Sequence, residues 1–237
     1  MIGHFTKALA QLDDPRLRRV LWLGILLSLL VFIALWTGLW MLADVLPLES
    51  IPGVHWLMET LGAAFDWLAG FLFVGMLLLF TLMLFPAVVT IIVGFFLDQV
   101  ADAVEARHYS TLPAPRHISL SETVMSTARF ALVTLIVNLI ALPFYVLLLF
   151  IPPMNLVLFY MVNGYLISRE YFELVAWRRL DPQAAARLRR SHRGRLQFAG
   201  ILLALLMTIP LVNLLTPVVG TAFMVHVFHH LQRREGG

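Results

Sequence analysis

The chain has 237 residues, of which 60% are hydrophobic and only 13% charged, and its mean hydropathy is +0.87. This composition excludes an ordinary soluble domain, so the sequence predicts one membrane domain over residues 1–237. The lack of cysteine excludes disulfides and thiolate metal sites. The net charge of +3 comes from sixteen arginines and Lys7, a balance that in membrane proteins marks cytoplasmic loops rather than a nucleic-acid partner.

The first two predicted helices follow from the pattern of polar and apolar residues and from two residues typical of helix starts. Residues 3–12 have an apolar and a polar side, which predicts an interfacial helix lying on the membrane. Asp14 can cap the next helix, and Pro15 suits its first position. We expect that helix to run over 15–45 as the first span, because residues 20–43 carry no charge and are enough for one crossing.

A second long helix is predicted after an acidic loop. The loop over 44–66 contains four acidic residues and neither lysine nor arginine. An uncharged run over 67–97 follows, which as one helix would measure ~46 Å against a hydrocarbon core of ~30 Å. Because an amphipathic pattern continues to His108, we expect a helix over 55–109 that holds the second span and projects beyond the bilayer.

The pattern I-P-x-x-N-L occurs twice, at 151–156 and 209–214, each time within an apolar segment. Proline ends a helix, so each copy predicts the tip of a helical hairpin, over 119–168 and 196–232. The 14-residue legs cover ~21 Å as helix, short of a ~30 Å core, so we expect re-entrant hairpins that penetrate only part of the bilayer. Two fully spanning hairpins are the alternative, since local thinning of the bilayer makes up several ångströms.

The hairpin tips have consequences for assembly. Pro152 with Asn155 and Pro210 with Asn213 mark the two tips, and the asparagines are expected to cap freed backbone groups or to line a polar pathway. Lipid cannot satisfy a turn at membrane depth. Two spans are too few to surround two such tips, so we expect a homo-oligomer.

The predicted fold is therefore an all-α membrane protein with two long transmembrane helices, two re-entrant (hemi-penetrating) helical hairpins and interfacial amphipathic helices. A basic interfacial helix is expected over 180–195, between the hairpins. In this topology Lys7 and every arginine lie on one face of the bilayer. By the positive-inside rule both termini are expected in the cytoplasm.

Two further groups of polar residues have a structural and a functional interpretation. Asp98, Asp102 and Glu105 share a helical face, where they could bind a cation or pair with the arginines of another segment. A solvated or salt-bridged cytoplasmic face is preferred. The H-x-x-H-H pattern over 226–230 resembles one histidine box of membrane di-iron oxidases. The remaining histidines are scattered singly, so we expect an interfacial histidine cluster and no metal or cofactor.

The chain as a whole resembles the CysZ sulfate permeases and the related etoposide-induced-protein domain family. Four stretches carry the resemblance, in order and with similar spacing: 14–19, 96–105, 151–171 and 198–217. The resemblance implies two long transmembrane helices, two hemi-penetrating hairpins, an oligomer, and movement of sulfate across a bacterial inner membrane.

In that family an arginine-containing motif at the start of the first long helix binds sulfate, and this motif corresponds to Leu17, Arg18 and Arg19. Arg16 lies beside them at the same helix start, which by itself favours an anion through free N–H groups and guanidinium donors. The alternative is that these arginines are ordinary positive-inside anchors reaching lipid headgroups. Where the family has a glycine, this chain has Asp14-Pro15-Arg16, and the acids at 13 and 14 would repel a dianion.

The expected function is a permease or channel for sulfate or a similar oxyanion in the inner (cytoplasmic) membrane. It is not expected to be an enzyme or to be driven by ATP, because no glycine-rich phosphate loop follows a strand. The alternative is a non-transporting membrane scaffold, a biogenesis or lipid-organising protein.

Overall fold

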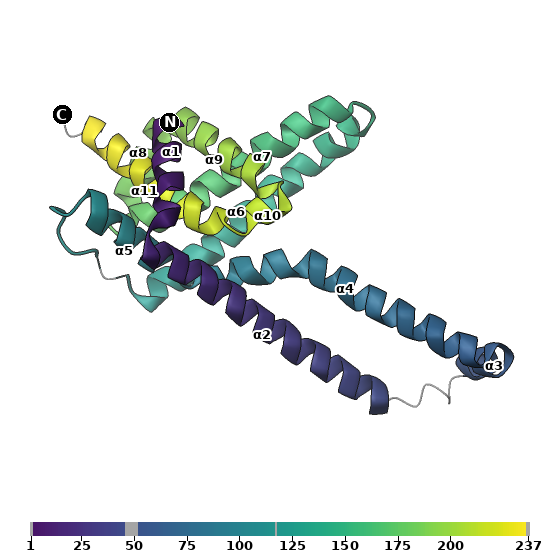
Figure 1. Cartoon of the computed structure of the whole chain (residues 1–237). Helices are drawn as coiled ribbons and strands as arrows, with labels where there is room; N and C mark the ends of the chain where they lie inside the picture. Colours follow the sequence, from purple (N-terminus) through teal and green to yellow (C-terminus); the bar gives the residue numbers. More distant parts are fainter. Residues whose placement is uncertain (1, 46–51, 117, 236–237) are drawn as a thin grey trace. The chain divides into compact units, whose positions relative to one another are not determined.

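The computed structural model describes residues 2–45, 52–116 and 118–235, and within these ranges every regular element is a helix, which confirms the all-α class (Figure 1). The chain forms two compact units, which we call unit 1 (Met1–Val20 with Phe96–Gly237) and unit 2 (Leu21–Phe95). Pro47 and Glu49 of the predicted acidic loop lie outside the described residues.

Unit 2 is built on two antiparallel helices. Most of α2 (Pro15–Val45) belongs to it, together with α3 (Pro52–Leu61) and α4 (Ala63–Gly94). Trp36 Nε1 donates a hydrogen bond to Thr81 Oγ1 at 3.0 Å, and the rings of Phe32 and Phe85 lie 5.8 Å apart. Residues with higher numbers in α2 contact residues with lower numbers in α4. The two helices are therefore antiparallel.

The structure divides the range 55–109, predicted as one helix, into α3, α4 and α5 (Leu97–His108). Gly62, between α3 and α4, has φ of +48°, a left-handed conformation that glycine adopts without steric cost. The second break, after α4, follows Gly94. α3 itself falls inside the predicted loop over 44–66, with Pro52 at its first position.

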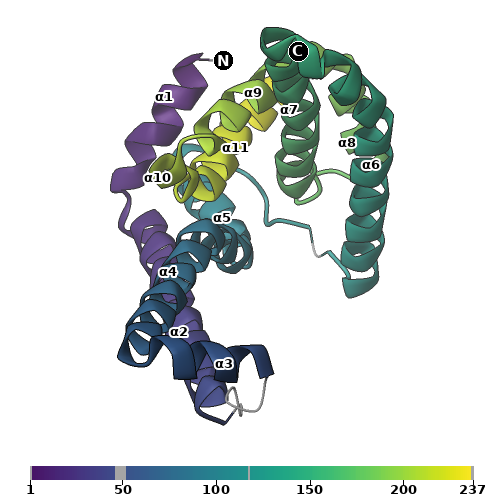
Figure 2. The ribbon, with the colours of Figure 1, turned by 90° about the vertical axis from the view of Figure 1, so that its right-hand side faces the viewer.

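Helix α11 (Thr216–Glu235) is the core of unit 1, because every side chain from Thr216 to His229 is buried. Four helices pack against it (Figure 2): α1 (Ile2–Ala10), α5, α7 (Pro152–Ala176) and α9 (Arg193–Met207). Phe223 meets Phe5 of α1 edge-on, with ring centroids 5.5 Å apart. The return leg of the second predicted hairpin is therefore enclosed by protein.

The predicted hairpin over 119–168 consists of α6 (Leu120–Leu147), a 3₁₀ turn (Leu148–Phe150) and the first part of α7. Ser119 and Glu122 form a capping box at the start of α6. The second I-P-x-x-N-L copy lies between α9 and α11, where Pro210 begins the short helix α10 (Pro210–Asn213). Both copies therefore end one helix and begin another.

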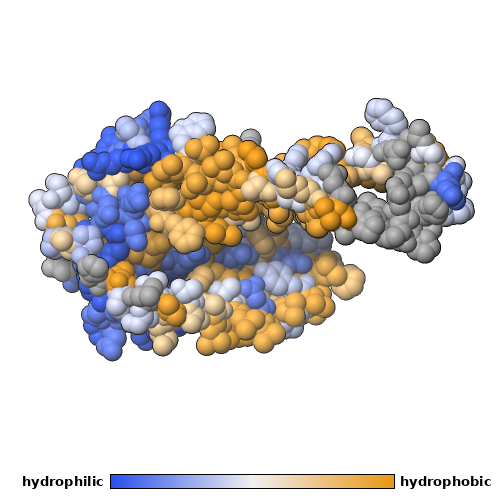
Figure 3. All heavy atoms as spheres, turned by 90° about the horizontal axis from the view of Figure 1, so that it is seen from below, coloured by the Kyte–Doolittle hydropathy of each residue, from blue (hydrophilic) through white to orange (hydrophobic). Residues whose placement is uncertain are grey.

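Three helices of the described chain are long and apolar enough to cross a membrane: Pro15–Leu42, Trp67–Gly94 and Ser121–Phe150. The first two are the predicted spans. The third belongs to the predicted hairpin over 119–168, so length and composition allow a third crossing there, and the re-entrant arrangement stays a prediction. Figure 3 shows apolar side chains over much of the visible surface, with hydrophilic residues gathered at the end of unit 1 that holds α5 and the end of α11.

Two glycines let α7 and α9 approach at backbone distance. A Cβ atom at Gly200 would overlap the Gly164 carbonyl group and would lie 2.7 Å from the Ser168 Cβ. A Cβ atom at Gly164 would lie 2.9 Å from the Ile201 backbone nitrogen. Small residues at such crossings are typical of helix pairs in membranes.

We therefore predict that Gly200→Ala destabilises unit 1, because neither backbone can move without separating the two helices. The cost should be roughly 1–3 kcal/mol, as for other overpacked sites, and should appear as a lower melting temperature in detergent by tryptophan fluorescence. Gly75→Ala is the matched control, since a Cβ atom there meets nothing within 4 Å. Equal melting temperatures for the two variants would contradict the close crossing.

Candidate functional site

The predicted anion site lies at the start of α2, in unit 1. The side chains of Arg16, Arg18 and Arg19 are exposed, whereas that of Leu17 is buried. The N–H of Arg16 donates to Asp14 Oδ1 at 2.9 Å, so Asp14 caps the helix as predicted. Within the described chain no hydrogen bond to the N–H of Leu17 is found, which leaves one donor of the first turn open.

The two acids before α2 take up part of the positive charge of this site. Arg18 Nη2 lies 2.5 Å from Asp13 Oδ1, and Arg107 Nη1 lies 3.4 Å from Asp14 Oδ2. Arg19 has no carboxylate within 4 Å in the described part of the chain. Within the described residues the site therefore holds one paired guanidinium, that of Arg18, and two without a carboxylate partner, those of Arg16 and Arg19.

The structure does not bring the first hairpin tip to these arginines. Figures 1 and 2 show the turn between α6 and α7 at a distance from the start of α2. At that tip Pro152 begins α7, and Asn155 Nδ2 reaches the Tyr145 carbonyl only at the long distance of 3.5 Å. At the second tip the N–H of Asn213 donates to the Ile209 carbonyl at 2.8 Å.

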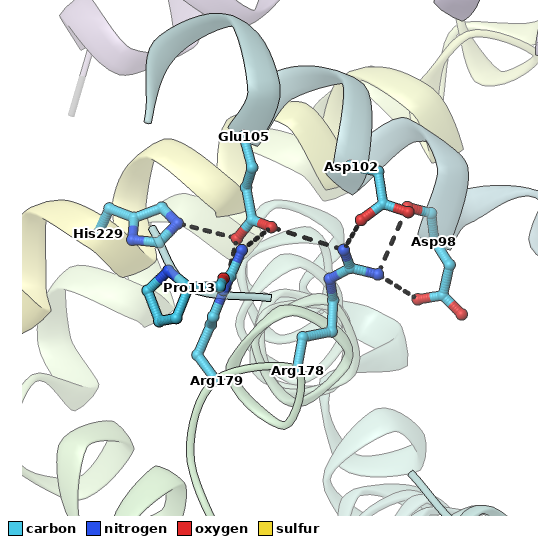
Figure 4. Close-up of polar contacts among 7 residues, drawn as sticks. All are labelled: Asp98, Asp102, Glu105, Pro113, Arg178, Arg179 and His229. Carbon is cyan, nitrogen blue, oxygen red and sulfur yellow. Dashed lines mark hydrogen bonds and ion pairs between the residues drawn. The ribbon is translucent and has the colours of Figure 1, made fainter. Parts of the chain in front are cut away.

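A network of charged side chains joins α5, the end of α7 and α11 (Figure 4). Arg179 donates to Glu105 through Nε at 3.1 Å and Nη2 at 2.6 Å, and His229 Nε2 lies 3.0 Å from the same carboxylate. Arg178 contacts Asp98 at 3.1 Å and also bonds Asp102. The acidic face of α5 thus pairs with arginines of another segment, which was one of the alternatives that the sequence left open.

Glu105 is the most enclosed member of this network, with 5% of its side chain exposed. Burial alone would raise the pKa of Glu105. Hydrogen bonds from His229 and Arg179, with the charges of Arg179 and Arg178, outweigh it and hold the pKa at about 2. The carboxylate is therefore ionised at neutral pH and acts as a fixed structural charge rather than a proton carrier.

Histidines of α11 extend the network toward the N-terminus. His226 Nδ1 lies 3.0 Å from Tyr109 Oη, and its Nε2 lies 3.2 Å from Gln11 Nε2. Both His226 and His229 are buried, and only His230 of the pattern is partly accessible. The position of this cluster at the membrane interface stays a prediction. No group of three potential metal ligands is found within the described residues.

Arg178, Arg179 and Gln11 are the network residues that sequence reasoning missed. The one signal was the Arg178-Arg179 pair directly after an apolar helix, at a spacing of more than 70 residues from its partners on α5. A single sequence does not show which of sixteen arginines meets that acidic face.

A comparison with protein families identifies the chain. The family described as sulfate transporter CysZ/etoposide-induced protein 2.4 matches residues 4–217. The chain belongs to this family. Comparison with curated proteins finds no match.

Membership of the CysZ/etoposide-induced protein family confirms the predicted resemblance and supports a transporter-type membrane protein. The matched range begins within α1 and ends at Pro217, so it includes the start of α2, both proline turns and the Arg178-Arg179 pair.

We predict that the Glu105 network makes stability depend on acid pH. The pKa of Glu105 falls from its ordinary 4.5 to about 2 on folding. Its contribution, roughly 3 kcal/mol, is therefore complete above pH 4.5 and is lost as pH falls toward 2. Glu105→Gln should melt at a lower temperature at pH 7, and its melting temperature should change less than that of the wild type between pH 4.5 and 2.

Asp98→Asn is the matched control on the same face of α5, because the Asp98 side chain is 72% exposed. An exposed pair contributes only about 0–1 kcal/mol, so this variant should keep the acid transition of the wild type. An unchanged acid transition in Glu105→Gln would contradict the assignment.

Proposed function

We propose that this protein is a permease or channel for sulfate or a similar oxyanion, and that conduction is passive or gradient-driven rather than coupled to ATP. The family match carries the proposal, and three apolar helices of membrane-spanning length support it. The proposed location is a bacterial inner membrane, with both termini and the arginines on the cytoplasmic side.

The start of α2 is the proposed capture site. It is the positive end of a 31-residue helix, where anions are stabilised. Arg18 and Arg19 supply planar donors that match the oxygen atoms of sulfate, and Arg16 adds positive charge. The Arg18–Asp13 pair does not block this role, because 58% and 83% of the two side chains are exposed and such a pair contributes about 0–1 kcal/mol.

The route through the membrane is proposed to form between subunits of a homo-oligomer. The turns at Pro152 and Pro210, with Asn155 and Asn213, are proposed to contribute polar backbone and amide groups to that route. Such groups at membrane depth need protein or water around them rather than lipid.

Radiolabelled sulfate flux into proteoliposomes without ATP tests the proposal. Wild-type protein should give flux above that of empty vesicles. Arg18→Ala with Arg19→Ala should lower it about tenfold or more at low sulfate, because each charge-assisted hydrogen bond contributes about 1.5–3 kcal/mol. Arg187→Ala with Arg234→Ala removes the same charge at two other exposed positions and should retain the flux.

Asp13→Asn should have the opposite effect on sulfate affinity in the same assay. It removes the partner of Arg18 and a negative charge, so the half-saturating sulfate concentration should fall several-fold. Asp14 remains to cap α2. Flux no higher than in empty vesicles would favour the scaffold interpretation, and full flux in the Arg18/Arg19 variant would move the capture site elsewhere.

A further inference from the structure

Unit 1 contains a second arginine-rich site, which is a cavity of about 300 Å³ between α7, α8 (Pro182–Ser191) and α9. Its polar lining comes from three elements: Ser168 and Arg169 of α7, Arg189 of α8, and Arg193, Gly194 and Gln197 of α9. Met161, Tyr165 and Leu196 complete the wall. We refer to it as the α7–α9 cavity.

The cavity has more positive than negative charge. Arg169 Nε donates to Glu173 Oε1 at 2.8 Å, and Arg189 Nε lies 3.7 Å from the same oxygen. Arg193 has no carboxylate within 4 Å in the described chain. Two guanidinium groups therefore share one carboxylate and the third has none, which leaves a net charge of about +2 among these four groups.

One of these arginines has a buried donor without an acceptor. The Nε of Arg189 is buried and lacks a hydrogen-bond partner within the described residues, and the nearest carboxylate oxygen, Glu173 Oε1, lies 3.7 Å away. The Arg169 side chain is only 6% exposed, and its Nε already uses that oxygen. A buried donor without an acceptor is costly, so this geometry fits a ligand that brings acceptor oxygens.

The first turn of α9 adds backbone donors to the same cavity. No side chain caps this 15-residue helix, whose first residues are Arg193 and Gly194. A Cβ atom on Gly194 would meet nothing within 4 Å, so the backbone there is accessible. The open N–H groups and the helix dipole favour an anion at this position.

We propose that the α7–α9 cavity binds a tetrahedral oxyanion, with Arg169, Arg189 and Arg193 as its charged donors. The ligand is either free sulfate or phosphate, or the phosphate of an anionic phospholipid. The volume is several times the ~30 Å³ share of one water molecule, so it accommodates organic atoms next to the oxyanion, and Met161 and Leu196 offer them an apolar wall. The site is independent of whether the protein conducts sulfate.

Ligand-dependent melting temperatures of the purified protein in neutral detergent test the proposal. Sodium sulfate and sodium phosphate are compared with sodium chloride at equal ionic strength, and phosphatidylglycerol is compared with phosphatidylcholine. A ligand that binds the folded state raises the melting temperature with its concentration. All measurements use the Arg18→Ala, Arg19→Ala background, so that binding at the start of α2 does not contribute.

Arg189→Gln and Arg193→Gln should each lower the affinity for the ligand that raises the melting temperature roughly tenfold or more. Arg190→Gln, an exposed neighbour on α8, should bind as the background protein does. Circular dichroism without ligand checks that the variants fold. A response to free sulfate or phosphate assigns the cavity to the free anion, and a response only to phosphatidylglycerol assigns it to the lipid.

The proposal is overturned if neither ligand class raises the melting temperature, or if Arg189→Gln and Arg193→Gln respond like Arg190→Gln. Sulfate flux is measured separately on the same cavity variants in the otherwise wild-type protein. If the cavity variants lose the rise in melting temperature but keep normal flux, the transport proposal stands. If they keep the rise in melting temperature but lose flux, the cavity proposal stands.

Discussion

The enclosed carboxylate of Glu105 is the constraint on which unit 1 depends. An ionised group with 5% of its side chain exposed requires partners, and these come from the end of α7 and from α11. Displacing Arg179 or His229 while Glu105 stays enclosed would leave its charge without a partner. The same contacts divide the arginines into two kinds, because Arg178 and Arg179 are committed to structure. The anion binding that we propose therefore involves other arginines, those at the start of α2 and in the α7–α9 cavity.

Local chemistry explains which parts of the fold were predictable. The Ser119 capping box, the Asp14 cap and the helix starts at proline depend on neighbouring residues, and the structure has them. The enclosure of α11 was not predicted, because an apolar segment suits lipid and a protein core equally well. Thr221 and His226, polar residues inside that segment, were the signal for a protein environment. The break at Gly62 was missed because a single glycine within a helical pattern does not by itself end the helix.

Long-range contacts explain what was missed in the candidate site. The exposure of Arg18 and Arg19 follows from their place at a helix start, and repulsion by the adjacent acids was read from the sequence. The structure adds that Asp13 pairs with Arg18 at the surface, where such a pair is readily exchanged. The partners of Glu105 and the cavity at Arg169 depend on segments that meet only after folding. No pattern within a short stretch of sequence shows which distant segments will be in contact.

A double-mutant cycle on Glu105 and Arg179 tests the central claim most directly. Free energies of unfolding in detergent are measured for the wild type, Glu105→Gln, Arg179→Gln and the double variant. If the buried pair holds α5 to the end of α7, the coupling energy should be about 2 kcal/mol or more, and the second substitution should cost little after the first. A coupling below about 0.5 kcal/mol, the level expected of independent sites, would contradict this account.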